Sequence, residues 1–327
     1  MRIVFMGTPE FAVPSLHTLL EQGYNIVAVV TQPDRPKGRK RTLTPPPLKE
    51  AALALGLPIL QPERMRNAEA VAELAAYEPD LIVTAAYGQI LPKSVLELPR
   101  LGCINVHGSL LPKYRGGAPI QRSIMNGEKV TGVTIMYMAE GLDTGDMISK
   151  VEVPITDEDT SGTLFEKLSL AGAKLLAETM PKLIAGEVQA VPQAEEEATY
   201  APNLKREDEQ INWSRSARQI YDQVRGLSPM AGAFTTLNGE VFKVWACGNL
   251  GQAAAEAASS EAAGTSKAAG AGTVLKVEPQ GITVQTGSGP LLVTVIQPSG
   301  KKAMPVSEWL KGTKLQPGTI LGGGDGA

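Results

Sequence analysis

The chain has 327 residues, with 31 Lys and Arg against 34 Asp and Glu, so its formal net charge is -3. With 43% hydrophobic residues it has enough apolar side chains for a buried core, which excludes a chain that is disordered throughout. The length exceeds one typical core and predicts two domains. The near-neutral charge argues against a protein that coats nucleic acid, although a net value hides local charge.

The two cysteines and the N-terminal residues bear on location. Cys103 and Cys247 lie far apart in the sequence, which excludes a disulfide framework and fits a reducing compartment. Residues 1–9 lack the pattern of a secretory signal, and no apolar run reaches the roughly 20 residues that span a bilayer. We therefore expect a cytoplasmic protein with no membrane partner, acting as a monomer.

In the first half, short apolar runs alternate with segments of helical character, which is typical of a parallel sheet flanked by helices. We expect strands at residues 3–6, 26–31, 81–85 and 103–107. Apolar residues between 11 and 20 fall on one helical face, with Thr8 as the expected N-cap and Pro9 at the first helical position. Further helices are predicted at residues 70–77 and 117–125.

The second half has a different pattern. Alternating runs at residues 133–138 and 147–153 predict a hairpin, and a long helical stretch follows at 160–184. After a polar, proline-containing segment, a helix at 214–225 precedes five short strand candidates at 231–237, 241–246, 273–277, 282–285 and 291–296, the number expected for a barrel of the OB type. We predict a Rossmann-like α/β catalytic domain at 1–189, a linker at 190–208 and an OB-like β-barrel at 209–327. An Ala/Gly/Ser-rich insertion at 249–272 interrupts the barrel.

Gly7 lies where a dinucleotide-binding fingerprint would begin, after a strand and before a helix. The second and third glycines of that fingerprint are absent, and Glu10 would place negative charge against a pyrophosphate. We therefore expect no nicotinamide cofactor.

His107 ends a predicted strand, and strand alternation places Cys103, Asn105 and His107 on one face. Ligands of open α/β sheets bind at the carboxyl ends of parallel strands, so an amide two residues before an imidazole is a candidate pair. Asp143, in a turn-rich loop, would orient the imidazole and favour its charged form. Alternatively, Asn105 and His107 only satisfy backbone groups at the strand end.

Other readings of these side chains are weaker. Cys103 and His107 could form a nucleophilic pair, but the thiol lies further back along the strand and a buried thiol is the simpler interpretation. His17 is read as a residue at a helix surface or boundary. Two His and two Cys at these spacings match no recognised zinc site, so no metal is expected.

Several motifs occur in order along the chain. They are Asn105-Val106-His107, Ser109-Leu110-Leu111-Pro112, residues 141–146, and residues 5–12, 31–36, 86–92 and 115–122. Together they resemble the formyltransferases that use 10-formyltetrahydrofolate, in the branch whose acceptor is methionyl initiator tRNA. The resemblance extends from Met1 to about Lys314.

The resemblance implies transfer of a formyl group from 10-formyltetrahydrofolate to the α-amino group of the methionine. On this hypothesis Asn105 donates to the oxyanion, His107 donates to it or moves the proton, and Asp143 holds His107 and accepts the proton of the amine. No covalent enzyme intermediate is required. The expected folate-binding residues are Ser109, Leu110, Leu111, Pro112, Tyr87, Gly88, Gln89 and Ile90.

A local excess of positive charge follows the second strand, where five cations occur within residues 35–41. Such a run is usually a solvated surface, yet it can also bind phosphates. By the resemblance this loop meets the tRNA acceptor stem, and a basic face of the barrel adds to it. The predicted tRNA-binding residues are Arg35, Lys37, Arg39, Lys40, Arg41, Lys243, Lys301 and Lys302.

Two alternatives remain open from the sequence. A folate-dependent formyltransferase acting on a small amine, such as glycinamide ribonucleotide or a sugar nucleotide, would need the same three catalytic residues. A non-catalytic RNA-binding protein on the same fold is the other. The basic loop and the barrel favour tRNA over a small amine, and the presence of Asn105, His107 and Asp143 together favours an enzyme.

Overall fold

The computed structural model describes residues 1–38, 40–250 and 269–323, which form two compact units. Unit 1 contains Met1–Pro119, Lys129–Ile155 and Leu164–Asn203. Unit 2 contains Ile120–Glu128, Thr156–Thr163 and the described residues from Leu204 on. Arg39 and most of the predicted insertion at 249–272 lie outside the described residues. The predicted domain boundaries at 189 and 209 stay a prediction.

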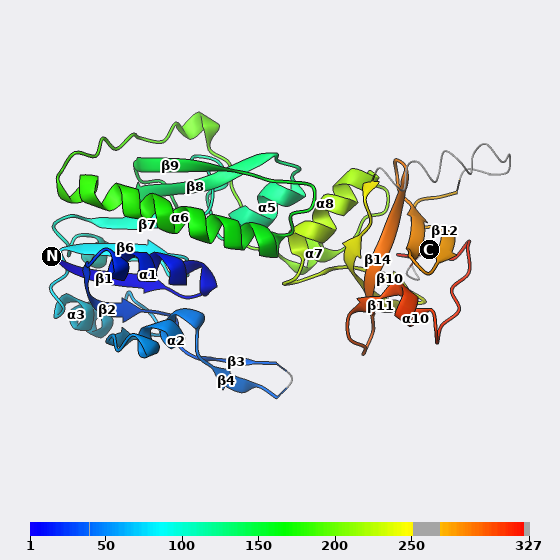
Figure 1. The fold of residues 1–327 in the computed structure, drawn as a ribbon, viewed down its shortest axis with the longest axis horizontal. Helices are drawn as coiled ribbons and strands as arrows, with labels where there is room; N and C mark the ends of the chain where they lie inside the picture. Colours follow the sequence, from blue (N-terminus) through cyan, green and yellow to red (C-terminus); the bar gives the residue numbers. More distant parts are fainter. Residues whose placement is uncertain (39, 251–268, 324–327) are drawn as a thin grey trace. The chain divides into compact units, whose positions relative to one another are not determined.

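Unit 1 is built on a seven-stranded sheet in the order β5-β2-β1-β6-β7-β8-β9 (Figure 1). The strands are β1 (Arg2–Gly7), β2 (Asn25–Val30), β5 (Ile59–Leu60), β6 (Leu81–Ala85), β7 (Cys103–His107), β8 (Val130–Tyr137) and β9 (Met147–Pro154). The first five strands in that order are parallel, and β8 and β9 are antiparallel additions. The predicted Rossmann-like sheet is confirmed.

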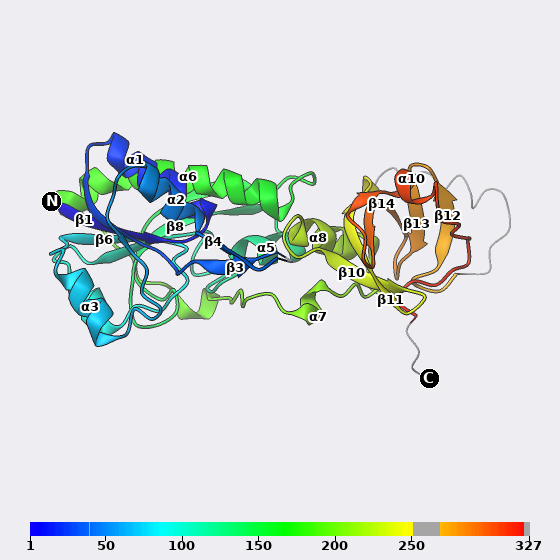
Figure 2. The same ribbon diagram turned by 90° about the horizontal axis from the view of Figure 1, so that it is seen from below.

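Helices cover both faces of this sheet. They are α1 (Val13–Glu21), α2 (Pro47–Ala54), α3 (Ala68–Ala75), α4 (Lys93–Leu96) and α6 (Ser161–Ile184). Figure 2 shows α1 and α6 on one side of the sheet and α3 on the other. The Phe11 and Phe165 rings meet edge to face at 5.4 Å between centroids, which packs α6 against the turn before α1.

Alternation along β7 decides which of its side chains face the candidate site. A Cβ at Gly172 of α6 would touch Val106 and Val133, so Val106 packs beneath that helix. Cys103 belongs instead to the buried cluster on the opposite face, with Leu74 of α3 and Val95 of α4. Since side chains alternate along a strand, Asn105 and His107 share the face of Cys103.

The predicted N-cap at Thr8 is wrong. A 3-10 turn at Glu10–Ala12 precedes α1, whose N-cap position is Ala12, with a proline in the first helical turn. The Thr8 hydroxyl instead donates to the carbonyl of Tyr87 at 2.8 Å. A tertiary partner at the carboxyl ends of β1 and β6 therefore takes the place of the local cap.

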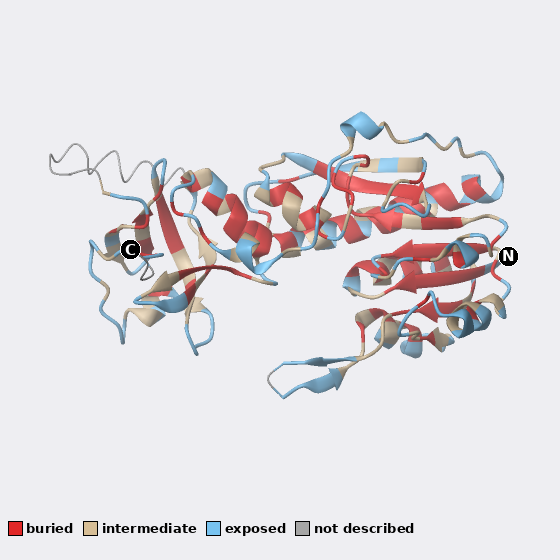
Figure 3. Cartoon of the chain, turned by 180° about the vertical axis from the view of Figure 1, so that it is seen from behind, coloured by how far each residue is buried: buried red, intermediate tan, exposed pale blue. Residues whose placement is uncertain are grey.

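The basic loop forms a two-stranded antiparallel hairpin of β3 (Arg35–Lys37) and β4 (Thr42–Thr44). Figure 3 shows buried residues along the strands of the unit 1 sheet, whereas this hairpin is exposed for most of its length. Lys37, Lys40 and Arg41 of this hairpin are exposed, so a ligand can reach them from solvent.

Unit 2 contains a six-stranded antiparallel, barrel-like sheet in the order β10-β11-β14-β13-β12, with β15 paired to β14. Its strands are β10 (Ala233–Leu237), β11 (Glu240–Cys247), β12 (Val274–Glu278), β13 (Gly281–Gln285), β14 (Pro290–Pro298) and β15 (Met304–Pro305). Its helices include α5 (Pro119–Met125), α7 (Arg206–Glu209), α8 (Ala217–Leu227) and α10 (Val306–Trp309). All five predicted strands are present.

Helix α8 packs against this sheet through its apolar face. Ile220, Val224 and Leu227 recur at helical spacing and are at most 1% exposed, packed in one cluster with Phe242 and Ile296 of the sheet. The helix begins with a capping box, in which the side chains of Ser216 and Gln219 each bond the backbone N–H of the other residue. Among the residues that the structure describes, no helix is both long and apolar enough to cross a bilayer.

Candidate active site

His107 is held at the end of β7 between two oxygen atoms. Its Nε2 lies 3.1 Å from the carbonyl oxygen of Tyr114, and its Nδ1 lies 3.7 Å from Oδ2 of Asp143. The ring is 6% exposed. The structure therefore brings together two predicted catalytic residues that are 36 positions apart in the sequence.

The two neighbours determine where a proton is gained or lost. A carbonyl oxygen can only accept a hydrogen bond, so Nε2 of His107 carries the proton that it donates to Tyr114. Nδ1 is then the nitrogen that takes up or releases a proton, and it faces the Asp143 carboxylate. The arrangement is suited to moving one proton at one defined atom.

Asp143 lies in the connection from β8 to β9, with a left-handed backbone at φ 52°. Its Oδ2 accepts a hydrogen bond of 2.8 Å from the backbone N–H of Gly116, in the loop that follows β7. Its own carbonyl oxygen accepts one of 2.7 Å from the side-chain amide of Gln193. Two other segments of unit 1 thus hold Asp143, one through its carboxylate and one through its backbone.

The amide of Asn105 is oriented by a neighbouring strand. The Thr84 hydroxyl on β6 lies 2.7 Å from Oδ1 of Asn105 and donates to it. Within the described part of the chain, Nδ2 of Asn105 makes no hydrogen bond, although the residue is half-buried. The amide N–H groups are therefore available to an oxygen of a bound substrate, as an oxyanion donor requires.

The predicted folate-binding loop after β7 is packed into unit 1. Ser109 and Leu111 expose no surface, and the Ser109 hydroxyl donates to the carbonyl of Lys113 at 2.6 Å. The Thr134 hydroxyl of β8 donates to the Ser109 carbonyl and accepts from the Leu111 N–H. Ser109 and Leu111 therefore support the loop from its buried side, whereas Leu110 is half-buried. The role of this loop in folate binding stays a prediction.

The second predicted folate segment follows β6. Tyr87 is buried, which raises the pKa of its phenol, whereas Gly88 is exposed and Ile90 is 81% exposed. The Gln89 amide donates to the Pro62 carbonyl, and its oxygen accepts from the Met65 N–H. The segment thus combines an anchored Tyr87 and Gln89 with an accessible edge.

The predicted tRNA-binding residues differ in accessibility. Arg35 pairs with Glu63 at 3.3 Å, with both side chains largely exposed. The ammonium of Lys243 instead donates to the Ala231 carbonyl at 2.6 Å and lies 5.3 Å from the Trp245 ring centroid, so packing within unit 2 accounts for it. The remaining described members of the set are exposed, namely Lys37, Lys40, Arg41, Lys301 and Lys302.

Three residues that contact the site loops were not predicted. Arg115, Gln193 and Glu195 form a hydrogen-bonded group next to Asp143. Arg115 lies within residues 115–122, one of the motifs that carry the family resemblance, and that motif could have indicated it. The other two lie in a polar segment whose composition indicates only a linker, so the sequence pattern held no sign of their contacts.

The alternative nucleophile, Cys103, does not suit covalent catalysis in this structure. It is 2% exposed, and burial raises the pKa of its thiol to about 12. The thiolate, which is the reactive form, is therefore scarce at neutral pH. His17 is exposed on α1, as its interpretation as a helix-surface residue requires.

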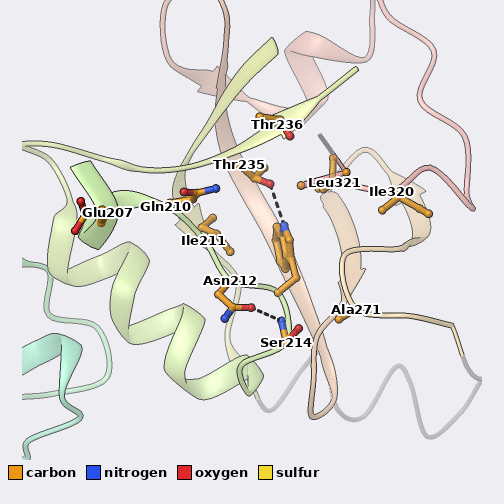
Figure 4. A pocket seen from close by; sticks show the side chains of 13 residues that line it. Glu207, Gln210, Ile211, Asn212, Ser214, Thr235, Thr236, Ala271, Ile320 and Leu321 are labelled. Atoms are coloured by element: carbon orange, nitrogen blue, oxygen red, sulfur yellow. Dashed lines mark hydrogen bonds between the residues drawn. The ribbon is translucent and has the colours of Figure 1, made fainter. Parts of the chain in front are cut away.

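Unit 2 contains a pocket of about 540 Å³ beside Trp213, whose indole N–H donates to the Thr235 hydroxyl at 3.0 Å (Figure 4). Its rim includes Glu207, Gln210 and Asn212. None of the predicted site residues lines it.

Known proteins match the whole length of the chain. The Formyl transferase family matches residues 1–180, and the Formyl transferase, C-terminal domain family matches residues 203–314. The chain is 56% identical to the methionyl-tRNA formyltransferase of Bacillus subtilis (strain 168) over 322 residues, 98% of each chain. It is 55% identical to the enzyme of the same name from Bacillus velezensis, again over 98% of each chain.

Solved structures agree on the fold. WlaRD, a sugar 3N-formyl transferase studied in the presence of dTDP and 5-N-formyl-THF, has a TM-score of 0.63 at 19% identity, over 92% of this chain and 99% of its own. The methionyl-tRNA formyltransferase of Clostridium thermocellum has a TM-score of 0.54 at 21% identity, over 77% and 94%. The chain therefore belongs to the formyl transferase family, and within it to the methionyl-tRNA formyltransferases.

Proposed function

We propose that this protein transfers the formyl group of 10-formyltetrahydrofolate to the α-amino group of methionyl initiator tRNA. One observation carries the proposal, which is identity above 50% to methionyl-tRNA formyltransferases over nearly the whole chain, across both units. The product would be formylmethionyl-tRNA for translation initiation. A cytoplasmic location and a monomeric state stay predictions.

The reaction is acyl transfer between two nitrogen atoms. The amine attacks the formyl carbon, the carbonyl oxygen becomes an oxyanion, and the bond from carbon to N10 of the folate then breaks. The attacking nitrogen must lose a proton and the leaving nitrogen must gain one. Because the amine itself is the nucleophile, no covalent intermediate with the enzyme is needed.

Three side chains fit these needs. The amide N–H groups of Asn105, which have no partner among the described residues, would donate to the oxyanion, a contact worth about 3 kcal/mol at comparable sites. Asp143 would accept the proton of the attacking amine, directly or through water. His107, whose Nδ1 faces Asp143, would stabilise the oxyanion or return the proton to the leaving nitrogen.

A solved structure with a similar fold supports binding of the formyl donor. WlaRD, which shares the fold, was studied with a formylated tetrahydrofolate. In the present chain the accessible edge of residues 88–90 and the half-buried Leu110 are the parts of the predicted folate segments that could touch such a ligand.

For the tRNA, the exposed hairpin of β3 and β4 is the proposed contact in unit 1, through Lys37, Lys40 and Arg41. Exposed lysines on one hairpin can neutralise several phosphates without any base contact. Lys301 and Lys302 are the proposed contacts in unit 2.

The acceptor separates this proposal from its alternatives. The fold alone does not choose the acceptor, because WlaRD formylates a sugar on a similar fold; the high identity over the full length favours methionyl-tRNA over a small amine. The test offers purified protein 10-formyltetrahydrofolate with methionyl initiator tRNA, glycinamide ribonucleotide or an amino-sugar nucleotide. Formylation of methionyl-tRNA alone is expected, and formylation of only a small amine would overturn the proposal.

A further inference from the structure

Residues 191–201, which we call the strap, lie along the loops of unit 1 that carry the candidate site. At one end Val191 and Met147 exchange two backbone hydrogen bonds of 2.8 and 2.9 Å. At the other end the Arg115 N–H donates to Thr199, and the Ala201 N–H donates to the Arg115 carbonyl, at 2.8 and 2.7 Å. The strap is therefore anchored both beside β9 and on the loop after β7.

Between these anchors, one side chain connects the two loops. The Gln193 amide nitrogen donates to the carbonyls of Asp143 and Gly145 at 2.7 and 2.8 Å. Its amide oxygen accepts from Nε of Arg115 at 2.9 Å. A single amide thus uses both of its N–H groups on the Asp143 loop and its oxygen on the loop after β7.

Arg115 fixes which way this amide points. Its side chain is 1% exposed and also donates to both carboxylate oxygens of Glu195, at 2.9 and 3.1 Å. Burial alone would lower the pKa of the guanidinium, but hydrogen bonds to Glu195 and Tyr200 raise it above its usual value. A guanidinium can only donate, so the oxygen of Gln193 must face Arg115 and its nitrogen must face Asp143.

The Asp143 loop depends on such contacts. Asp143 has a left-handed backbone, which costs free energy for a residue with a side chain and persists where the surroundings hold it. The carboxylate lies beyond hydrogen-bond distance of His107, so that pair alone does not fix it. The Gly116 N–H and the Gln193 amide hold the residue from its two ends.

We propose that Gln193 is a positioning residue for formyl transfer, which holds Asp143 beside His107 through the backbone of the Asp143 loop. The inference rests on the proposed function, in which Asp143 accepts the proton of the amine. Gln193 touches neither substrate in this account. Its loss should therefore slow the chemical step while leaving substrate binding nearly unchanged.

The test replaces Gln193 by Glu, which keeps the shape and the acceptor for Arg115 but loses both donors and turns a carboxylate oxygen toward two carbonyls. The expected result is a fall of kcat by about tenfold to a hundredfold, with KM for both substrates within about twofold. Gln22→Glu is the matched control, because the Gln22 amide also donates to a backbone carbonyl, that of Ala177, on another part of unit 1. It should leave kcat unchanged.

A double variant distinguishes positioning from a general effect on folding. If Gln193 acts through Asp143, then Asp143→Asn with Gln193→Glu should be no slower than Asp143→Asn alone. Additive losses, or an unchanged kcat in Gln193→Glu, would overturn the inference. Gln193→Met, which keeps the length without charge, serves if Gln193→Glu lowers the thermal midpoint, and it should show the same loss of kcat.

The same set of variants separates this inference from the proposed function. A wild-type protein that does not formylate methionyl-tRNA refutes the function itself. An active wild type with a fully active Asp143→Asn refutes the role of Asp143, and with it the role of Gln193. An active wild type with a slow Asp143→Asn and an unimpaired Gln193→Glu refutes Gln193 alone.

Discussion

At the residue scale, the candidate site works by restricting polar groups that would otherwise have several orientations. The Thr84 hydroxyl donates a hydrogen bond to the oxygen of the Asn105 amide, which leaves the amide nitrogen for a ligand. The Tyr114 carbonyl accepts a hydrogen bond from Nε2 of His107, so that Nδ1 is the nitrogen that faces Asp143. In each of these two side chains, a partner on one side determines which atom is left for the proposed chemistry.

The contact between Thr84 and Asn105 gives a prediction. Thr84→Val keeps the shape of the side chain but removes the donor, so the Asn105 amide loses its fixed orientation. We expect kcat for formylation to fall by about tenfold, corresponding to one neutral hydrogen bond of about 1.4 kcal/mol. Steady-state formylation of methionyl-tRNA measures this.

Thr84→Ser is the control for that variant, because it retains the hydroxyl and should stay close to wild-type activity. A Thr84→Val enzyme as fast as Thr84→Ser would show that the orientation of Asn105 does not depend on Thr84.

At the residue scale, some residues of the candidate site could be predicted from the sequence and others could not. The pairing of Asn105 and His107 follows from strand alternation, and the loop motif indicated Asp143. Gln193 could not be found, because a glutamine between a proline and a run of acidic residues has no periodicity and its partners lie 48 to 78 residues away. Contacts of that range depend on the folded path of the strap.

At the element scale, the sequence predicts strands that have an apolar periodicity, but not short strands or caps that lack one. The sheet and the barrel strands follow from apolar periodicity, but β3, β4 and the short β5 have too few apolar residues to give such a pattern. The Thr8 cap was predicted from local sequence, and a tertiary hydrogen bond to Tyr87 took its place. Local rules fail where a side chain finds a distant partner.

Helices α5 and α7 of unit 2 are joined by a paired ion contact. Arg122 donates to both carboxylate oxygens of Asp208, at 2.9 and 2.8 Å. These hydrogen bonds hold the pKa of Asp208 below its usual value of 3.8. A carboxylate with a lowered pKa stabilises the folded state above its unfolded pKa, and this contribution is lost as the pH falls through the lowered value.

We therefore expect Asp208→Asn to lower the free energy of unfolding by about 1–3 kcal/mol at pH 7. The difference from wild type should shrink below pH 3.8 and vanish once wild-type Asp208 is protonated. Urea unfolding at pH 7, 5 and 3 measures this difference in free energy.

The control is Glu308→Gln, which breaks an exposed pair with Lys311 and should change the free energy of unfolding by less than about 0.5 kcal/mol. A difference that is the same at pH 7 and pH 3 would contradict the assignment.

At the scale of the whole molecule, a net charge of -3 conceals an uneven distribution. The exposed hairpin of unit 1 carries Lys37, Lys40 and Arg41, whereas the strap carries Glu195 and its acidic neighbours. A small overall negative charge is therefore compatible with an acidic, phosphate-bearing substrate, whose proposed contact is the hairpin where the local charge is positive.

Charge removal on the hairpin tests this view. Lys40→Ala with Arg41→Ala should weaken binding of methionyl initiator tRNA and reduce the slope of log affinity against log salt by up to about 2. Lys174→Ala with Lys182→Ala makes the same change in net charge on exposed positions of α6 and should leave the slope unchanged. Binding titrations at several salt concentrations measure both. An equal effect of the two pairs would mean that only net charge matters.

We propose that formyl transfer to methionyl-tRNA takes place at His107 and its neighbours. The most direct measurement is the single-turnover rate of formylation with saturating 10-formyltetrahydrofolate and methionyl initiator tRNA, in wild type, His107→Ala and His17→Ala. The two variants remove the two histidines of the chain one at a time. We predict a loss of about a hundredfold or more for His107→Ala with tRNA binding retained, and the wild-type rate for His17→Ala. Formylation by His107→Ala at the wild-type rate would contradict the account.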